Sequence, residues 1–484
     1  MPPIVPFTGS EMEPGDHHQS TTIKNMSPSF KFRITLISAF LLFAHLSIGQ
    51  SLLAPVRVAN LNPNGASSPS NLTVGGTNKD HLFYVCDNGV PGGSARRVWI
   101  YDLAASTGIQ TMLREGPESM RILSSAGDRF FYSYSSSGYS SQAEVKWHGI
   151  NGTVAGNIFA GQFRAPIIGV TIGTNLITSG NFPQGSPSAG IEPCAIDPIA
   201  RTSTLLRNIA PGSTSSEITG FTLHNNKAYF AATNTASGRE LYTTDGTPAG
   251  TLMLKDIIAG ATGSEPADMR SAGGRLYFSA LSVIGNREPW TCNGTTAGTV
   301  KLKEINPSTT VGSDPKEFTA MGTKVFFSAN DGTNGRELWV TDGTANGTVM
   351  VKDIITGSSG SNPHDLVVFN KKLWFVASDG LGRMRSLYAT DGTSGGTVKM
   401  LSLPANSDGE HLNVCNGKLF YVSRDATSSK MWCTDGTAKG TKQVQPAISP
   451  NINPIGTGPM VVMGNWLYFN ANFDATGAEL WKVQ

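Results

Sequence analysis

The chain has 484 residues, 15% of them charged, and a formal net charge of +2. A nearly neutral chain without a basic run lacks the electrostatic surface that nucleic-acid binding requires, so the composition argues against nucleic acid as a partner. The sequence also contains no acidic tail and no polybasic segment that would favour a membrane surface.

The beginning of the chain has the features of a targeting signal. Residues 1–25 are polar, and Met26 is an alternative start of translation. Basic residues precede an apolar run at residues 34–48, which Gly49 follows. The run is shorter than the roughly 20 residues that a membrane span needs, and the whole pattern is typical of a secretory signal peptide. We therefore predict a signal peptide at residues 26–50, with a transmembrane anchor as the alternative, and a secreted or cell-surface mature chain without a transmembrane span.

The cysteines are few and widely spaced. An odd number of cysteines without a CxxC pair does not fit a secreted disulfide framework, a redox motif or a metal site. We therefore expect them to be small buried side chains on strands. They are Cys86, Cys194, Cys292, Cys415 and Cys433.

One stretch of the sequence shows the elements that we expect throughout the mature chain. It has a first strand at residues 267–272 and, after a Gly-Gly turn, a second strand rich in aromatic residues at 275–280. A third strand at 288–291 and an alternating fourth strand at 299–305 follow. Four short antiparallel strands joined by tight glycine turns are typical of one blade of a β-propeller. No helical period interrupts the array.

A motif joins the third and fourth strands. Residues 335–348 read GRELWVTDGTANGT, and variants return about every 48 residues. An Asp-Gly pair between two strands is a strong hairpin signal, because glycine accepts positive φ and the carboxylate can bond to nearby backbone N–H groups. The alternative, calcium, needs roughly six to eight oxygen ligands, whereas each turn offers one Asp. The predicted structural turns are Asp245-Gly246-Thr247, Asp342-Gly343-Thr344, Asp391-Gly392 and Asp435-Gly436.

A glutamate recurs in the ELW part of the motif, usually after an arginine. A catalytic acid would be unique within an enzyme, so we expect these repeated charges to form ion pairs within or between repeats. Ser386 and Lys430 take the position in two copies, which shows that the pairing is not obligatory. The glutamates are Glu240, Glu288, Glu337 and Glu479.

The number of repeats and the two ends of the array predict a closed ring. The aromatic signature of the second strand recurs nine times, which favours nine blades over the alternative of eight blades and an irregular N-terminal segment. The last repeat stops in its third strand, at Leu480-Trp481, and residues 55–63 resemble the fourth strand at 300–307. Closure removes an open sheet edge. We therefore predict one all-β propeller over residues 51–484, its last blade closed by the N-terminal strand.

The repeat resembles the ELWxxDGT repeat family of secreted bacterial proteins. The match is specific at residues 337–344, strong from Gly238 onward and weaker before that. The turn also resembles the Asp-box of sialidase-type propellers, in turn chemistry alone, and the arginine triad of sialidases is not traceable. The resemblance to the ELWxxDGT family implies a propeller-like fold and an extracellular or cell-surface location, but no defined reaction.

Two classes of function remain open. The first is a non-enzymatic module, expected to be monomeric and without a cofactor, that binds an extracellular protein or glycan through the loops of one face. The second is a secreted carbohydrate-active hydrolase or lyase with its site in the central channel, where first strands lie. His364 and His411 begin two such strands, but two histidines do not make a metal site, and we assign no catalytic or metal-binding residue. The candidate ligand-contacting loop residues are Tyr139, Phe182, Asn330 and Asp331.

Overall fold

The computed structural model describes residues 54–59, 66–87, 96–104, 113–114, 120–134, 143–149, 157–163, 168–182, 189–380, 385–404, 407–425, 429–444, 459–473 and 477–484. The chain divides into two compact units, Met1–Leu52 and Leu53–Gln484. The predicted N-terminal extension and signal peptide therefore lie outside the described residues. All elements below belong to the second unit.

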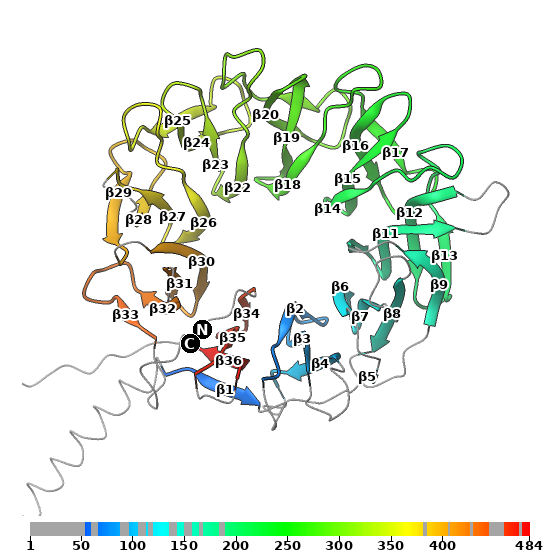
Figure 1. Cartoon of the computed structure of the whole chain (residues 1–484), viewed down its shortest axis with the longest axis horizontal. Coiled ribbons are helices and arrows are strands. Elements are labelled where there is room, and N and C mark those ends of the chain that lie inside the picture. The colour runs from blue at the N-terminus through cyan, green and yellow to red at the C-terminus, as the bar shows by residue number, and fades with distance from the viewer. Residues whose placement is uncertain are drawn as a thin grey trace, which may run out of the picture. The chain divides into compact units, whose positions relative to one another are not determined.

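Within the described residues the second unit contains strands and no helix. Its strands, β1 to β36, form nine four-stranded antiparallel sheets in a ring (Figure 1). The prediction of a nine-bladed β-propeller is confirmed, and the eight-blade alternative is wrong. We number the blades 1 to 9 along the chain. In each blade the first strand lies at the inner side of the ring, and the later strands follow outward (Figure 1).

Blades 1 to 3 contain the repeats whose motifs are degenerate. Blade 1 has β2 (Ser70–Gly75), β3 (His81–Asp87), β4 (Arg96–Asp102) and β5 (Leu113–Arg114). Blade 2 has β6 (Met120–Ala126), β7 (Arg129–Tyr134), β8 (Ala143–Gly149) and β9 (Asn157–Phe163). Blade 3 has β10 (Gly169–Ile172), β11 (Asn175–Phe182), β12 (Ala189–Asp197) and β13 (Thr202–Leu205).

Blades 4 to 6 follow the repeat most closely. Blade 4 has β14 (Thr219–His224), β15 (Lys227–Asn234), β16 (Gly238–Thr244) and β17 (Leu252–Lys255). Blade 5 has β18 (Ala267–Ala272), β19 (Arg275–Val283), β20 (Asn286–Cys292) and β21 (Val300–Lys301). Blade 6 has β22 (Lys316–Met321), β23 (Lys324–Asn330), β24 (Arg336–Thr341) and β25 (Val349–Lys352).

Blades 7 to 9 complete the ring. Blade 7 has β26 (His364–Phe369), β27 (Lys372–Ser378), β28 (Arg385–Thr390) and β29 (Val398–Ser402). Blade 8 has β30 (Asp408–Cys415), β31 (Lys418–Arg424), β32 (Ser429–Thr434) and β33 (Lys442–Gln443). Blade 9 has β34 (Val461–Met463), β35 (Trp466–Ala471), β36 (Glu479–Val483) and, as its outer strand, β1 (Val56–Ala59).

Blade 9 is closed by the N-terminal strand, as predicted. β1 pairs antiparallel with β36, with Val56 opposite Lys482. β34, the inner strand of blade 9, also contacts β2 of blade 1. Lys482 Nζ donates a hydrogen bond to the Tyr101 hydroxyl in blade 1 at 3.0 Å. The ring is thus closed by sheet pairing within blade 9 and by side chains that join blade 9 to blade 1.

Buried aromatic side chains of the second strands pack the blades against one another. Phe83 of blade 1 stacks on Phe130 of blade 2, with ring centroids 4.6 Å apart. Tyr229 of blade 4 packs with Phe278 and Trp290 of blade 5. Because a second strand has a blade on each side, both its faces are buried and its sequence is a continuous apolar run. Full burial of one such side chain contributes about 1.5–3 kcal/mol, so these layers hold the inner strands in fixed positions around the channel.

Candidate functional site

The DGT turns are closed by their own side chains. In blade 6, Asp342 Oδ1 accepts hydrogen bonds from the backbone N–H of Thr344 at 2.9 Å and from its hydroxyl at 2.7 Å. Gly343 has φ +93°, which favours glycine. A Cβ on Gly347 would lie 2.0 Å from Asp342 Oδ1, so this second glycine makes room for the carboxylate. The bonds from Thr344 lower the pKa of Asp342.

The same contacts recur in the other copies of the turn. Asp245, Asp391 and Asp435 each accept from the N–H and hydroxyl of the Thr two residues later. In blade 5, Asn293 Oδ1 takes the same two bonds from Thr295, at 3.1 and 2.8 Å. One acceptor oxygen is therefore sufficient for the turn, and the carboxylate oxygen that each turn uses is committed to the fold.

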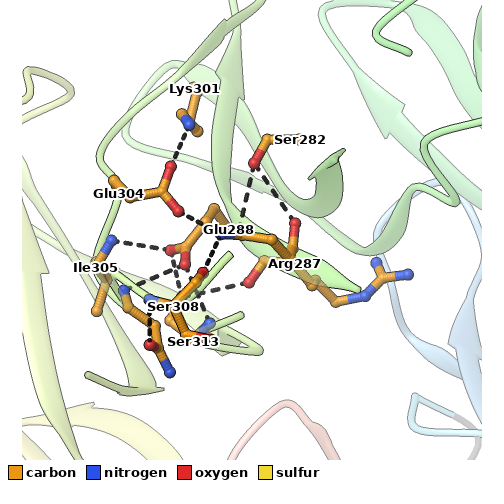
Figure 2. A network of polar contacts seen from close by, with 10 residues as sticks. Ser282, Arg287, Glu288, Lys301, Glu304, Ile305, Ser308 and Ser313 are labelled. Atoms are coloured by element: carbon orange, nitrogen blue, oxygen red, sulfur yellow. Dashed lines mark hydrogen bonds and ion pairs between the residues drawn. The ribbon is translucent and has the colours of Figure 1, made fainter. Parts of the chain in front are cut away.

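Backbone amides, rather than the expected arginine, are the partners of the repeated glutamate in blades 4 to 6. Glu288 is fully buried and accepts hydrogen bonds from the backbone N–H groups of Ile305, Asn306 and Ser313 at 3.0 to 3.2 Å (Figure 2). The Ser313 hydroxyl donates a further bond at 2.6 Å. These donors lie on the segment that leads from blade 5 to blade 6. The carboxylate thus fixes the connection between the two blades, and we call this kind of contact a latch. Burial raises the pKa of Glu288 despite these bonds.

Equivalent latches hold other connections. Glu240 accepts from Ile258 N and Ser264 Oγ, and Glu337 accepts from Ile355 N, Ser361 N and Ser361 Oγ. Glu192, in a degenerate repeat, accepts from Ile209 N and Ala210 N. Glu479 of blade 9 accepts from the N–H and hydroxyl of Ser67, before blade 1. For the glutamates, ion pairing was the wrong expectation, because their partners are backbone amides and serine hydroxyls, which carry no charge. In two of these copies the arginine does pair with an acid, Arg239 with Glu265 and Arg336 with Asp314.

The cations of the repeat also bond mainly to backbone oxygens. Arg287 donates to Glu265 O at 2.7 Å, and Arg336 donates to Asp314 O at 2.8 Å. Lys303, after the fourth strand of blade 5, donates to Thr348 O in the turn of blade 6 at 2.8 Å. These contacts join neighbouring segments and blades, so the repeated charges belong to the scaffold.

The inner strands differ from one another at one equivalent position that lies on the channel side of the ring. Each of several inner strands has a β-bulge near its start, occupied by a residue with positive φ. Blades 5 to 8 carry Asp268, Glu317, Asp365 and His411 at this position, whereas blades 1 and 4 carry Asn71 and Gly220. We call it the bulge position.

Carboxylates at the bulge position bond across blade boundaries. Glu317 Oε2 accepts from the N–H of Leu366 in blade 7 at 3.2 Å, and Asp365 Oδ1 accepts from the N–H of His411 in blade 8 at 3.0 Å. Burial, with the charge of Asp365 nearby, raises the pKa of Glu317. The structure therefore links the two histidines named in the sequence through Asp365, which contacts the ring of one and the backbone of the other.

His364 lies between two carboxylates. Its Nδ1 is 3.0 Å from Asp365 Oδ2, and its Nε2 is 3.2 Å from Asp408 Oδ1. Arg385 Nε lies 3.5 Å from the same oxygen of Asp408. Burial lowers the pKa of His364, but the two carboxylates outweigh burial and raise it to about 9. At neutral pH the ring is therefore a cation between two carboxylates; Nδ1 bonds to Asp365, and Nε2 has no hydrogen-bond partner among the described residues.

On the other side of the ring, the inner strands of blades 1 to 4 line a cavity of about 490 Å³. Its wall exposes more polar than apolar surface, and Pro459, which precedes β34, completes it. At the bulge position of blade 4, Gly220 contributes no side chain to this wall. At the bulge position, titratable side chains therefore lie in blades 5 to 8, and blades 1 and 4 have uncharged residues there. The apolar lining includes Leu72, Leu123, Ile168 and Phe221.

The predicted loop contacts are turn residues where the structure describes them. Asn330 Oδ1 accepts from the N–H of Gly332, and Asp331 Oδ1 accepts from the N–H groups of Thr333 and Asn334. Phe182 is the last residue of β11, and its side chain lies outside the described residues, as does Tyr139. Sequence reasoning did not find Glu317, Asp365, Asp408 or the cavity wall.

The remaining sequence predictions concern cysteines, metals and membranes. The five cysteines are buried, as predicted, and burial raises the pKa of the Cys415 thiol to about 11. In the described part of the chain, no group of three or more His, Cys, Asp or Glu side chains is placed to hold a metal ion. Over the same residues, no helix has the length and apolar character of a membrane span.

Nine four-stranded blades around a channel define the second unit as a β-propeller. No family model and no curated protein match the chain. Among solved structures, it is similar to the β-propeller domain of the trilobed protease from Pyrococcus furiosus, with 11% identity and a TM-score of 0.37 over 79% of this chain and 100% of that one.

Two further solved structures are similar in the same way. A prolyl endopeptidase has 8% identity and a TM-score of 0.42, covering 85% of this chain, which spans 56% of that one. The oligogalacturonate lyase from Vibrio parahaemolyticus has 10% identity and a TM-score of 0.38, covering 74% of this chain and 98% of that one. At these identities the similarity concerns the fold alone.

Proposed function

We propose that the chain is a secreted or cell-surface member of the ELWxxDGT repeat proteins and that its propeller binds an extracellular protein or glycan without transforming it. The ligand-binding surface in this proposal is the channel side of the ring, because the repeated motif is committed to the scaffold. The DGT carboxylates close their own turns, and the ELW glutamates hold the connections between blades.

The observation that best supports this proposal is the protonation state of the His364 ring. A general base must be neutral near the working pH and have a free nitrogen within reach of the substrate. With a pKa of about 9 and a carboxylate at each ring nitrogen, His364 holds its proton at neutral pH. The cluster is thus better suited to hold blades 7 and 8 together than to remove a proton from a ligand.

A hydrolase or lyase is the second candidate, and one observation favours it. Glu317 lies at the bulge position beside Asp365, and its pKa is raised. A carboxyl group with a raised pKa beside a second carboxyl group is an arrangement that general acid catalysis uses in glycoside hydrolysis. The same carboxylate accepts a backbone bond from Leu366, which is a scaffold role.

The two candidates are separated by measuring binding and turnover on the same preparation. Soluble polysaccharides, including polygalacturonate, and extracellular proteins are immobilised, and binding of the purified chain is measured by interferometry. Reducing-end release is followed in parallel. We expect saturable binding without release. Release of reducing ends that disappears in Glu317→Gln would establish the enzyme instead.

The location is tested independently. The chain is expressed with its own N-terminus, and the first residue of the protein in the culture medium is determined by mass spectrometry. We expect cleavage near residue 51, at the end of the predicted signal peptide. A chain that stays uncleaved in the cytoplasm would refute the extracellular proposal.

A further inference from the structure

We propose that the ring opens at the boundary between blades 7 and 8, and that ionic contacts of Asp408 on the channel side hold this boundary closed. The boundary is thus a conformational device that responds to ionic strength, whatever ligand the propeller binds. Blades 3 to 8 repeat the same connecting elements, so the boundaries between them can be compared position by position.

The latch is missing between blades 7 and 8. At the boundaries from blade 4 to blade 7, a serine hydroxyl of each connecting segment donates to the latch glutamate. In blade 7 the glutamate position holds Ser386. The serine of the next connection, Ser407, donates instead to Pro404 O at 2.6 Å, within its own segment. Among the described residues, this hydroxyl therefore does not tie the connection to blade 7. The serines that do reach a latch are Ser264, Ser313 and Ser361.

A hydrogen bond at the outer rim is also missing there. At the boundaries from blade 3 to blade 7, a basic side chain at the end of the fourth strand donates to a backbone carbonyl in the turn of the next blade, at 2.7 to 2.9 Å. We call this contact the rim bond. In blade 6 the donor is Lys352, opposite Leu338. The equivalent residue of blade 7, opposite Leu387, is Leu401, which has no donor for Thr441 O of blade 8. The rim bonds join Arg207 to Thr251, Lys255 to Thr299, Lys303 to Thr348 and Lys352 to Thr397.

Other contacts across this boundary have counterparts elsewhere and do not compensate for the two missing ones. A buried apolar cluster joins blades 7 and 8, but similar clusters join blades 4 and 5, blades 5 and 6, and blades 6 and 7. Asp365 accepts from the N–H of His411 in blade 8, as Glu317 accepts from the N–H of Leu366 in blade 7. The boundary between blades 7 and 8 therefore has the weakest set of structural hydrogen bonds among those compared.

Charged groups at the start of β30 hold this boundary instead. Asp408 Oδ1 lies 3.2 Å from His364 Nε2 and 3.5 Å from Arg385 Nε, and both cations belong to blade 7. Near the DGT turn, Asn370 adds an exposed hydrogen bond to Asp435 O at 3.3 Å. The side chain of Asp408 is half exposed, so salt screens its attraction to the two cations. The latch glutamates of the other boundaries are fully buried, and salt reaches their contacts much less.

The test is amide hydrogen exchange of the purified full chain, followed by mass spectrometry. Peptides from β29 and β30, on the two sides of the boundary, are compared with the equivalent peptides from β25 and β26. Protection factors report the free energy of local opening. We expect protection in β29 and β30 to be at least about tenfold lower, because one latch and one rim bond are missing. Equal or higher protection there would overturn the proposal.

Two reciprocal variants test the rim bond. Leu401→Lys places in blade 7 the residue that blade 6 carries, within reach of Thr441 O, and should raise protection in β29 and β30 severalfold. Lys352→Leu is the matched reverse change and should lower protection in β25 and β26 by a similar factor. Circular dichroism shows which variants fold. Unchanged protection in whichever variant folds would overturn the proposal.

A charge variant and salt test the ionic contacts. Asp408→Asn removes the shared negative charge and keeps the side-chain size, so protection in β29 and β30 should fall further. The matched control is Asp314→Asn, which removes an acid of similar exposure that pairs with Arg336 and should leave these strands unchanged.

The salt arm uses the same peptides at neutral pH. Raising sodium chloride from about 0.01 M to about 1 M shortens the Debye length from about 30 Å to about 3 Å. Protection in β29 and β30 should fall in the wild type, should change much less in Asp408→Asn, and should stay constant in β25 and β26. Protection in β29 and β30 that responds neither to salt nor to Asp408→Asn would overturn the proposal.

Discussion

Replacing Glu288 with alanine should destabilise the propeller far more than the loss of one surface charge. Glu288 is fully buried in blade 5, and its two oxygens accept three backbone N–H groups and one hydroxyl from the segment that leads to blade 6 (Figure 2). Alanine removes both acceptors and leaves these donors inside the protein.

The magnitude follows from the number of donors. A buried donor without a partner costs about 1–3 kcal/mol, and the Ser313 hydroxyl can rotate toward Arg287 O, 3.5 Å away. Counting the three amides alone predicts a loss of about 3–9 kcal/mol in the free energy of unfolding. Glu288→Gln keeps one acceptor oxygen and the side-chain volume, so it should cost less than half of this.

The assay is urea unfolding followed by tryptophan fluorescence. Glu304→Ala is the matched control, because Glu304 lies in the same network and forms a partly exposed ion pair with Lys301. Pairs of that kind contribute about 0–1 kcal/mol. If Glu288→Ala costs no more than Glu304→Ala, the carboxylate is not a latch and the reasoning is refuted.

Three further predictions follow from the same contacts. Deleting residues 51–61 removes β1 and exposes the edge of β36, so the melting temperature should fall sharply; an unchanged melting curve would refute closure by this strand. The pKa of His364 is raised from 6.5 to about 9, so its contribution to stability is complete below pH 6.5 and is lost as the pH rises through about 9. Urea midpoints at pH 6 and pH 10 should therefore differ more in the wild type than in His364→Gln. Asp342→Asn should preserve the turn as Asn293 does, whereas Asp342→Ala should lower the urea midpoint, and equal midpoints would contradict the turn assignment.

The fold was accessible from the sequence because each blade repeats its local signals. The aromatic second strands gave the blade count, and the likeness of residues 55–63 to 300–307 predicted the strand that pairs with β36. The described part of this strand, β1 (Val56–Ala59), lies within the predicted stretch, and residues 60–63 lie outside the described residues.

The contacts of the motif were less accessible. The role of Glu288 depends on backbone amides, and the one side-chain signal is a serine 25 residues later, Ser313. The sequence does contain a signal for the bulge position, because Asp268, Glu317 and Asp365 each follow a proline by two residues. The cavity could not be predicted in this way. Its wall combines ordinary strand residues from four blades, and the sequence of a single repeat does not show how those blades are placed around the cavity.

The closing latch differs from the others in the distance along the chain that it spans. Glu288 and its donors are 17 to 25 residues apart, whereas Ser67 and Glu479 are 412 residues apart. Blades 3 to 6 can thus be secured as they emerge, but blade 9 requires segments from both ends of the array. A polypeptide that stops before β36 keeps an unpaired β1 and an open ring, which makes it a substrate for proteolysis or aggregation. The ring can therefore close only after the whole array has been synthesised.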